Sequence, residues 1–261
     1  MFKRFVFGCL LVLMATLARA QSPALYQYST LEALSSGVFA GELSVAVLLT
    51  KGDFGVGTFN GLNGEMVVLN GQAWRANPDC TLVQSEASDR IPFADVTFFK
   101  PQGQEHLPKL DNLAGLAAWL DSKLPGPRVF AAAKISGSFA SLTLRSPSKQ
   151  SPPFPTLAQA LASQHVRHLS NVSGTIVAIR CPKDVGDLAV PGWHFHFISQ
   201  DEALGGHVLE AGPDQATASW MVLRRVELAL PQGGAFDQTK PGTLNTDEIM
   251  SLEGAQPISK P

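Results

Sequence analysis

Three of the six histidines are spaced so that their side chains can meet. His194 and His196 stand two residues apart in the apolar segment Trp193–Ile198, which reads Trp-His-Phe-His-Phe-Ile. Because side chains two apart in a strand point to the same face, both imidazoles are expected on one side of it. The polar segment 199–206 ends in two glycines and suits a chain reversal, so His207 is expected to open a returning strand beside the first.

Three imidazoles around one point predict a metal centre. Three protein ligands leave a coordination position open, which is typical of catalytic rather than structural zinc. We therefore predict that Zn²⁺ is bound by His194, His196 and His207. The remaining histidines stand in polar surroundings and are expected at the surface; they are His106, His165 and His168.

The elements that must position these side chains are mostly strands. Alternating runs around Asn/Gly turns predict a β-hairpin over residues 53–69, and apolar residues at helical spacing predict a helix over 110–124. Short helices are expected at 30–36, 42–49 and 156–162. Further strands are expected at 93–99, 129–145 with a break at 136–138, 174–181, 193–199, 207–211 and 220–230.

This pattern predicts a mixed, strand-rich α/β protein of two sheet-based parts with flanking helices. Residues 146–155 contain four prolines and mark the expected boundary. The N-terminal part would then span residues 21–150. The C-terminal part, residues 151–261, would carry the His-x-His strand and the metal site.

The first twenty residues are expected to be a cleaved signal peptide. Lys3 and Arg4 precede an apolar run, and Ala18-Arg19-Ala20 is a typical cleavage site. We therefore expect an exported protein, periplasmic or secreted, with no membrane segment in its mature form. Export would leave Cys80 and Cys181 in an oxidising compartment, and the sequence leaves open whether they pair.

Composition excludes several classes of protein. Of 261 residues, 45% are hydrophobic and 16% charged, which is too apolar for an intrinsically disordered chain. The formal net charge of −2 provides no basic surface for nucleic acid. A small-molecule substrate is the expected partner.

Five segments together point to a known family. They are Leu25–Thr30, Gly52–Glu65, Pro92–Phe99, Gly192–Phe197 and Gly205–Leu209. Their order and content resemble α-acetolactate decarboxylases over nearly the whole chain after residue 20. The departures are conservative, such as Trp193 where a tyrosine is usual, and they leave the three histidines intact.

The resemblance implies an activity and a set of site residues. It implies a zinc enzyme that converts 2-acetolactate to acetoin and carbon dioxide without oxidation, with the zinc on the three histidines. It further implies that Glu65, Arg145 and Glu253 face the site, with Thr58 nearby. The resemblance also implies a homodimer formed through the N-terminal sheet.

The chemistry of the substrate agrees with this implied site. Zinc can chelate the ketone and hydroxyl oxygens of acetolactate and, as a Lewis acid, stabilise the enediolate left by loss of carbon dioxide. No organic electron sink is then needed. Arg145 would orient the substrate carboxylate. Either Glu65 or Glu253 would protonate the enediolate, and the sequence leaves that choice open.

Two other functions fit the same histidines. A different zinc enzyme, a hydratase or hydrolase, also uses three histidines and activates a metal-bound water. An exported, non-catalytic metal-binding protein would use the same ligands without turnover. That second alternative leaves Glu65 and Arg145 unexplained.

Overall fold

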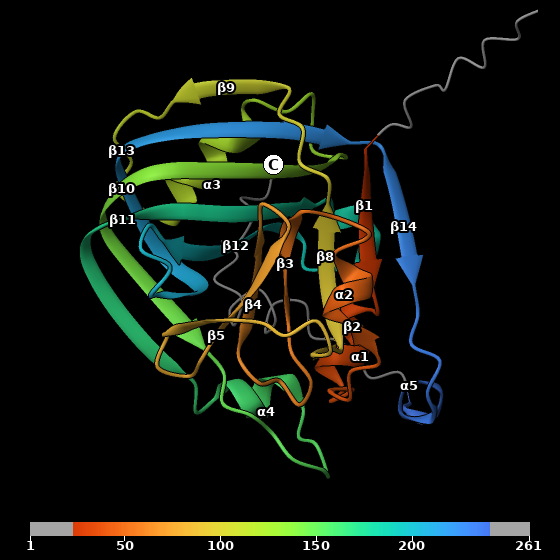
Figure 1. Ribbon diagram of the computed structural model, residues 1–261. Coiled ribbons are helices and arrows are strands. Elements are labelled where there is room, and N and C mark those ends of the chain that lie inside the picture. The colour runs from red at the N-terminus through yellow and green to blue at the C-terminus, as the bar shows by residue number, and fades with distance from the viewer. Residues whose placement is uncertain (1–22, 241–261) are drawn as a thin grey trace, which may run out of the picture.

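Two β-sheets packed against each other form the protein (Figure 1). The computed structural model describes residues 23–240, so the expected signal peptide and Glu253 lie outside the described residues. The strand-rich mixed α/β architecture predicted from the sequence is confirmed. In Figure 1 the long strands β10, β11 and β13 run across the strands of the other sheet.

The first sheet has seven strands in the order β14-β1-β8-β3-β4-β5-β6. Their bounds are β1 (Ala24–Tyr28), β3 (Phe54–Thr58), β4 (Glu65–Leu69), β5 (Gln72–Ala76), β6 (Leu82–Gln84), β8 (Phe93–Thr97) and β14 (Arg225–Ala229). A small separate ladder pairs β2 (Leu43–Ser44) with β7 (Arg90–Ile91).

The second sheet has five strands in the order β10-β11-β12-β13-β9. They are β9 (Gly103–His106), β10 (Phe130–Ser146), β11 (His165–Cys181), β12 (Gly192–Ser199) and β13 (Gly205–Leu223). Strand β10 pairs along its length with both β11 and β13, and β12 pairs with these same two strands. The four strands therefore form a closed ring of hydrogen-bonded neighbours.

The helices of residues 23–240 are short. They are α1 (Leu31–Ser35), α2 (Val45–Leu48), α3 (Leu113–Asp121), α4 (Leu157–Leu161), α5 (Gly234–Gln238) and the 3₁₀ helix η1 (Lys183–Leu188). Four of them begin at residues whose side-chain oxygen accepts a backbone N–H of the first turn: Thr30, Ser44, Asn112 and Thr156. Over residues 23–240, the structure contains no helix with the length and apolarity needed to span a bilayer.

Apolar side chains from both sheets interlock between them. Phe54 and Val56 of β3 pack with Val177 and Ile179 of β11 in one buried cluster. Removal of this apolar surface from water holds the sheets together. The predicted histidine cluster lies beside this contact, because Val177 is the cross-strand partner of His196.

The expected break of the strand at residues 136–138 is wrong. Strand β10 runs through Gly137, which is paired with Gly174 on one side and Ala216 on the other. A Cβ on Gly137 would lie 2.1 Å from the carbonyl oxygen of Gln215, and the register with β13 shifts just after it. The glycine therefore permits close strand approach beside a β-bulge rather than a turn.

The expected boundary at residue 150 does not coincide with the division between the sheets. Strands β9 and β10 precede it and belong to the five-stranded sheet, whereas β14 follows it and pairs with β1. The proline-rich segment 147–156 is a loop that connects β10 to α4. This proline-rich loop therefore marks the end of β10 rather than the division between the sheets.

Cys80 and Cys181 are both buried and both free thiols. They belong to different hydrophobic clusters, Cys80 with the residues around α3 and Cys181 with those between the two sheets. The pairing that the sequence left open is therefore absent from the structure.

Candidate functional site

Strands β12 and β13 bring the three histidines together, as their spacing predicted. His196 and His207 are cross-strand partners, and His194 lies on the same face two residues earlier. The Nε2 atom of His194 lies 3.0 Å from His207 Nδ1 and 3.1 Å from His196 Nε2. His196 and His207 are fully buried. One ring nitrogen from each histidine therefore lies within 4.8 Å of the others.

The protonation of this cluster suits metal binding. The Nδ1–H of His196 donates to the carbonyl oxygen of Met66 at 2.6 Å. Because a carbonyl only accepts, the proton is on Nδ1 and the lone pair is on Nε2. Burial, together with the charge of Arg145, lowers the pKa of His194 to about 3, so this ring is neutral at physiological pH.

The spacing of the nitrogens also fits a metal ion. Ligand nitrogens at 2.0–2.1 Å from a tetrahedral zinc are roughly 3.3 Å apart, close to the two observed separations. Three imidazoles suit several divalent ions, and the cluster does not select zinc among them. The donor set therefore fits the predicted metal centre.

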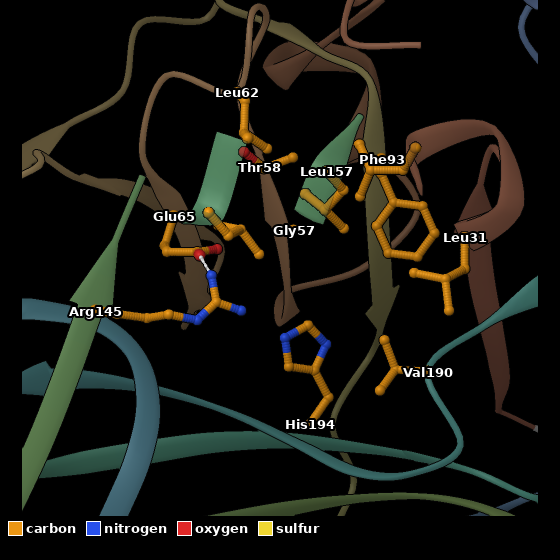
Figure 2. A pocket seen from close by; sticks show the side chains of 12 residues that line it. Leu31, Gly57, Thr58, Leu62, Glu65, Phe93, Arg145, Leu157, Val190 and His194 are labelled. Carbon is orange, nitrogen blue, oxygen red and sulfur yellow. Dashed lines mark hydrogen bonds and ion pairs between the residues drawn. The ribbon is translucent and has the colours of Figure 1, made fainter. Parts of the chain in front are cut away.

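A buried ion pair lies beside the histidines. Arg145 Nη1 donates to Glu65 Oε1 at 2.9 Å (Figure 2). The other carboxylate oxygen of Glu65 lies 3.5 Å from His196 Nε2. Arg145 is only 2% exposed and is the cross-strand partner of His207. Burial of this charged pair is costly unless it is fully bonded, so a functional role is the natural explanation.

Ser146 holds these two charged residues in place. Its hydroxyl donates to the carbonyl oxygen of Ala76 at 2.7 Å and accepts the backbone N–H of Glu65. The end of β10 is thereby fastened to β4 and β5, and Arg145 is held against Glu65. Sequence reasoning missed Ser146, because a serine beside a proline-rich loop gives the same signal whether it is buried or exposed.

Thr58 stands at the start of the β3–β4 turn. It is the cross-strand partner of Glu65, and its hydroxyl donates to the carbonyl oxygen of Gly64 at 2.8 Å. Gly64 has φ +90°, and a Cβ there would lie 2.2 Å from the carbonyl oxygen of Ala76. The glycine is therefore required for this turn, which places Thr58 and Glu65 side by side.

Four of these residues line one small pocket. Its polar end is formed by Thr58, Glu65, Arg145 and His194. Its apolar end is formed by Leu31, Leu34, Leu62, Phe93, Leu157, Leu161 and Val190, which pack in one cluster. Figure 2 shows His194 between these two ends. The sequence did not predict the apolar end, because its side chains come from short segments far apart in the chain.

The other candidates do not join this site. His106, His165 and His168 are exposed, as expected, and His106 and His168 contact the hydroxyls of Thr217 and Thr143. Glu253 lies outside the described residues.

Comparison with known proteins agrees with this geometry. Residues 25–241 match the sequence profile of the alpha-acetolactate decarboxylase family. This chain belongs to that family. A curated alpha-acetolactate decarboxylase from Methanosarcina mazei is 38% identical over 232 residues, which is 89% of this chain and 81% of the relative. The corresponding protein from Raoultella terrigena is 33% identical, over 82% of this chain and 83% of the relative.

Solved structures of the family share the fold. The crystal structure of alpha-acetolactate decarboxylase from Bacillus subtilis strain 168 superposes with a TM-score of 0.86 at 30% identity. The match covers 88% of this chain and 99% of that one. A Staphylococcus aureus protein described as similar to alpha-acetolactate decarboxylase gives a TM-score of 0.83 at 26% identity, over 89% of this chain and 100% of that one.

Proposed function

We propose that this protein is a Zn²⁺-dependent acetolactate decarboxylase that converts 2-acetolactate to acetoin and carbon dioxide. The family membership supports the reaction. The observation that carries the proposal is the three-histidine cluster beside the buried Glu65–Arg145 pair at one pocket. When bound there, zinc would supply a Lewis acid that draws electron density from the ketone and hydroxyl oxygens of the substrate.

Arg145 would orient the substrate. Its guanidinium lies in the pocket wall with His194 and is paired with Glu65, so an entering carboxylate would contact Arg145 beside that pair. The carboxylate loses its charge as carbon dioxide departs, and tight binding of that charge throughout the reaction would oppose the step. Arg145 therefore serves orientation in this mechanism rather than stabilisation of the transition state.

A carboxyl group must then deliver a proton to the carbon that has lost carbon dioxide. Glu65 borders the pocket and lies 3.5 Å from His196, which supports Glu65 as a candidate donor. Glu253 is the alternative donor. The handedness of acetoin distinguishes them: Glu→Gln at the donor should abolish the stereochemical preference, whereas the same change at the other position should lower the rate and preserve it.

The decisive assay measures acetoin released from racemic acetolactate, with the metal content of the same sample measured by mass spectrometry. We expect turnover and about one zinc per chain. A different three-histidine zinc enzyme, such as a hydratase or hydrolase, would retain the metal and give no acetoin. A non-catalytic metal-binding protein would give the same null result with every substrate tried.

We also propose that the chain is exported after cleavage near Ala20 and forms a homodimer through the seven-stranded sheet. The n-region, apolar run and cleavage pattern of residues 1–20 support export. The mass of the secreted polypeptide tests the cleavage, and the molar mass of the native protein in solution tests the homodimer.

A further inference from the structure

The 3₁₀ helix η1 precedes the segment that reaches the pocket and lies mostly at the surface. None of its six residues is buried, and its Asp184 makes an exposed ion pair with Arg128. An exposed ion pair contributes little to the position of a segment. The chain leaving η1 nevertheless supplies Val190 to the pocket wall and then enters β12, which carries His194 and His196. Of the side chains of η1, Val185 packs against the hydrophobic cluster between the two sheets, whereas Leu188 at its end is 41% exposed, so the end of η1 needs a contact of its own to be fixed.

Gln27 supplies a buried anchor. This residue of β1 is 2% exposed, and its Nε2 atom donates to the carbonyl oxygen of Leu188, the last residue of η1, at 2.6 Å. The same atom donates to the carbonyl oxygen of Ser29 at 2.9 Å. A side-chain amide nitrogen has two hydrogens, so one group can make both bonds.

The two carbonyls belong to the segments that lead into two different walls of the pocket. Ser29 has φ +68° and precedes Thr30, the N-cap of α1, whose Leu31 and Leu34 line the apolar end. Leu188 precedes Val190 by two residues, and Leu31 and Val190 pack in the same cluster (Figure 2). A single amide thus fastens the start of α1 to the end of η1.

We propose that Gln27 is a positioning residue that holds the α1 wall and the Val190 wall together and thereby limits the size of the substrate's apolar substituent. The inference rests on the proposed function, since it concerns which 2-hydroxy-3-oxo acids enter that pocket. Gln27 itself does not line the pocket. It acts through Leu31 and Val190, and the reacting groups at the polar end are left in place.

The test replaces Gln27 with Met, which has a similar volume and no N–H donor. Gln72→Met is the matched control, because Gln72 is an exposed glutamine in the same sheet. Hydrogen exchange should accelerate about tenfold in residues 29–35 and 183–190 of the Gln27 variant, since loss of one hydrogen bond has about this effect on local opening. The control should match the unaltered protein.

The second readout is selectivity between acetolactate and its homologue with propyl in place of methyl on C2. The kcat/KM ratio should move at least about threefold toward the larger acid in Gln27→Met, because less rigid walls discriminate less between alkyl groups. We expect kcat on acetolactate to stay within about threefold, since the polar end is untouched.

Unchanged exchange in both segments, or unchanged selectivity, would overturn the proposal. Equal acceleration of exchange across the whole protein would also overturn it, since this would indicate general destabilisation. If Gln27→Met does not fold, Gln27→Asn provides the same two readouts, because its shorter side chain withdraws the amide from both carbonyls. Absence of acetoin formation by the unaltered protein would refute the proposed function, while the exchange measurement would still decide whether Gln27 fastens the walls.

Discussion

At the scale of single residues, the site depends on buried side chains whose hydrogen-bond partners hold them in place. The carbonyl of Met66 sets the tautomer of His196, and Arg145 donates to Glu65 where both side chains are buried. Each of these contacts joins a strand of one sheet to a strand of the other. Substitutions at these positions should therefore affect metal binding, catalysis and stability in different proportions.

His196→Ala should abolish metal retention and activity together, because two remaining imidazoles hold zinc poorly. The metal content and the acetoin rate of the purified variant measure this. His168→Ala is the control, since His168 is exposed on β11. This substitution should change neither the metal content nor the acetoin rate. Normal metal content in the His196 variant would refute its assignment as a ligand.

Arg145→Ala should retain the metal and lower kcat/KM at least roughly 100-fold, through loss of substrate orientation. The variant also leaves Glu65 buried without its cation, so its free energy of unfolding should fall by about 3–5 kcal/mol. Chemical denaturation of the double variant Arg145→Ala/Glu65→Ala should show part of that stability restored. A single variant with unaltered kinetics would show that Arg145 has no role in the reaction.

At the scale of elements, close pairing of β3, β4 and β8 places the polar end of the pocket. A Cβ on Gly55 would lie 2.1 Å from the carbonyl oxygen of Asp95, so β3 and β8 approach more closely than a side chain allows. Gly55→Ala should force these strands apart and lower stability by roughly 2–4 kcal/mol. Gly115→Ala in α3 is the control: a Cβ there meets its nearest atom at 3.4 Å, and the change should be neutral or stabilising. A thermal midpoint for Gly55→Ala equal to that of the control would contradict this account.

Asp95 on β8 makes the stability of this sheet dependent on pH. Full burial raises the pKa of its carboxyl from 3.8 to about 7. The folded state therefore holds a proton that the unfolded state releases at a lower pH, and stability falls as the pH rises from about 4 to 7. Asp95→Asn should remove this part of the dependence. Chemical denaturation at pH 5 and pH 8 measures it, and identical pH dependence in both proteins would contradict the assignment.

The sequence predicted the parts of the site that depend on local spacing. A two-residue separation in a strand placed His194 and His196 on one face, and the following turn brought back His207. It did not predict the buried state of Ser146, the contact of His196 with Met66, or the apolar end of the pocket. These depend on how two sheets pack, and no local pattern records that. Gly137 was misread for the same reason, since its partner strand lies far along the chain.

At the scale of the whole molecule, both sheets contribute residues to the site. The seven-stranded sheet supplies Thr58 and Glu65, and the five-stranded sheet supplies Arg145 and the histidines. The pocket therefore exists only when both sheets are folded and packed. Because a metal bound to the folded state stabilises that state by mass action, removal of the metal should lower the thermal midpoint. A differential scanning measurement with and without chelator checks this, and an unchanged midpoint would contradict metal binding at the junction of the sheets.

The measurement that tests the central claim most directly is a zinc titration of the chelator-treated protein, followed by acetoin formation from 2-acetolactate. Acetoin formation should be negligible without metal. It should then rise in proportion to added zinc and level off at about one equivalent per chain, as expected for a single three-histidine site. Full acetoin formation by the metal-free protein, or none after zinc is restored, would contradict the account.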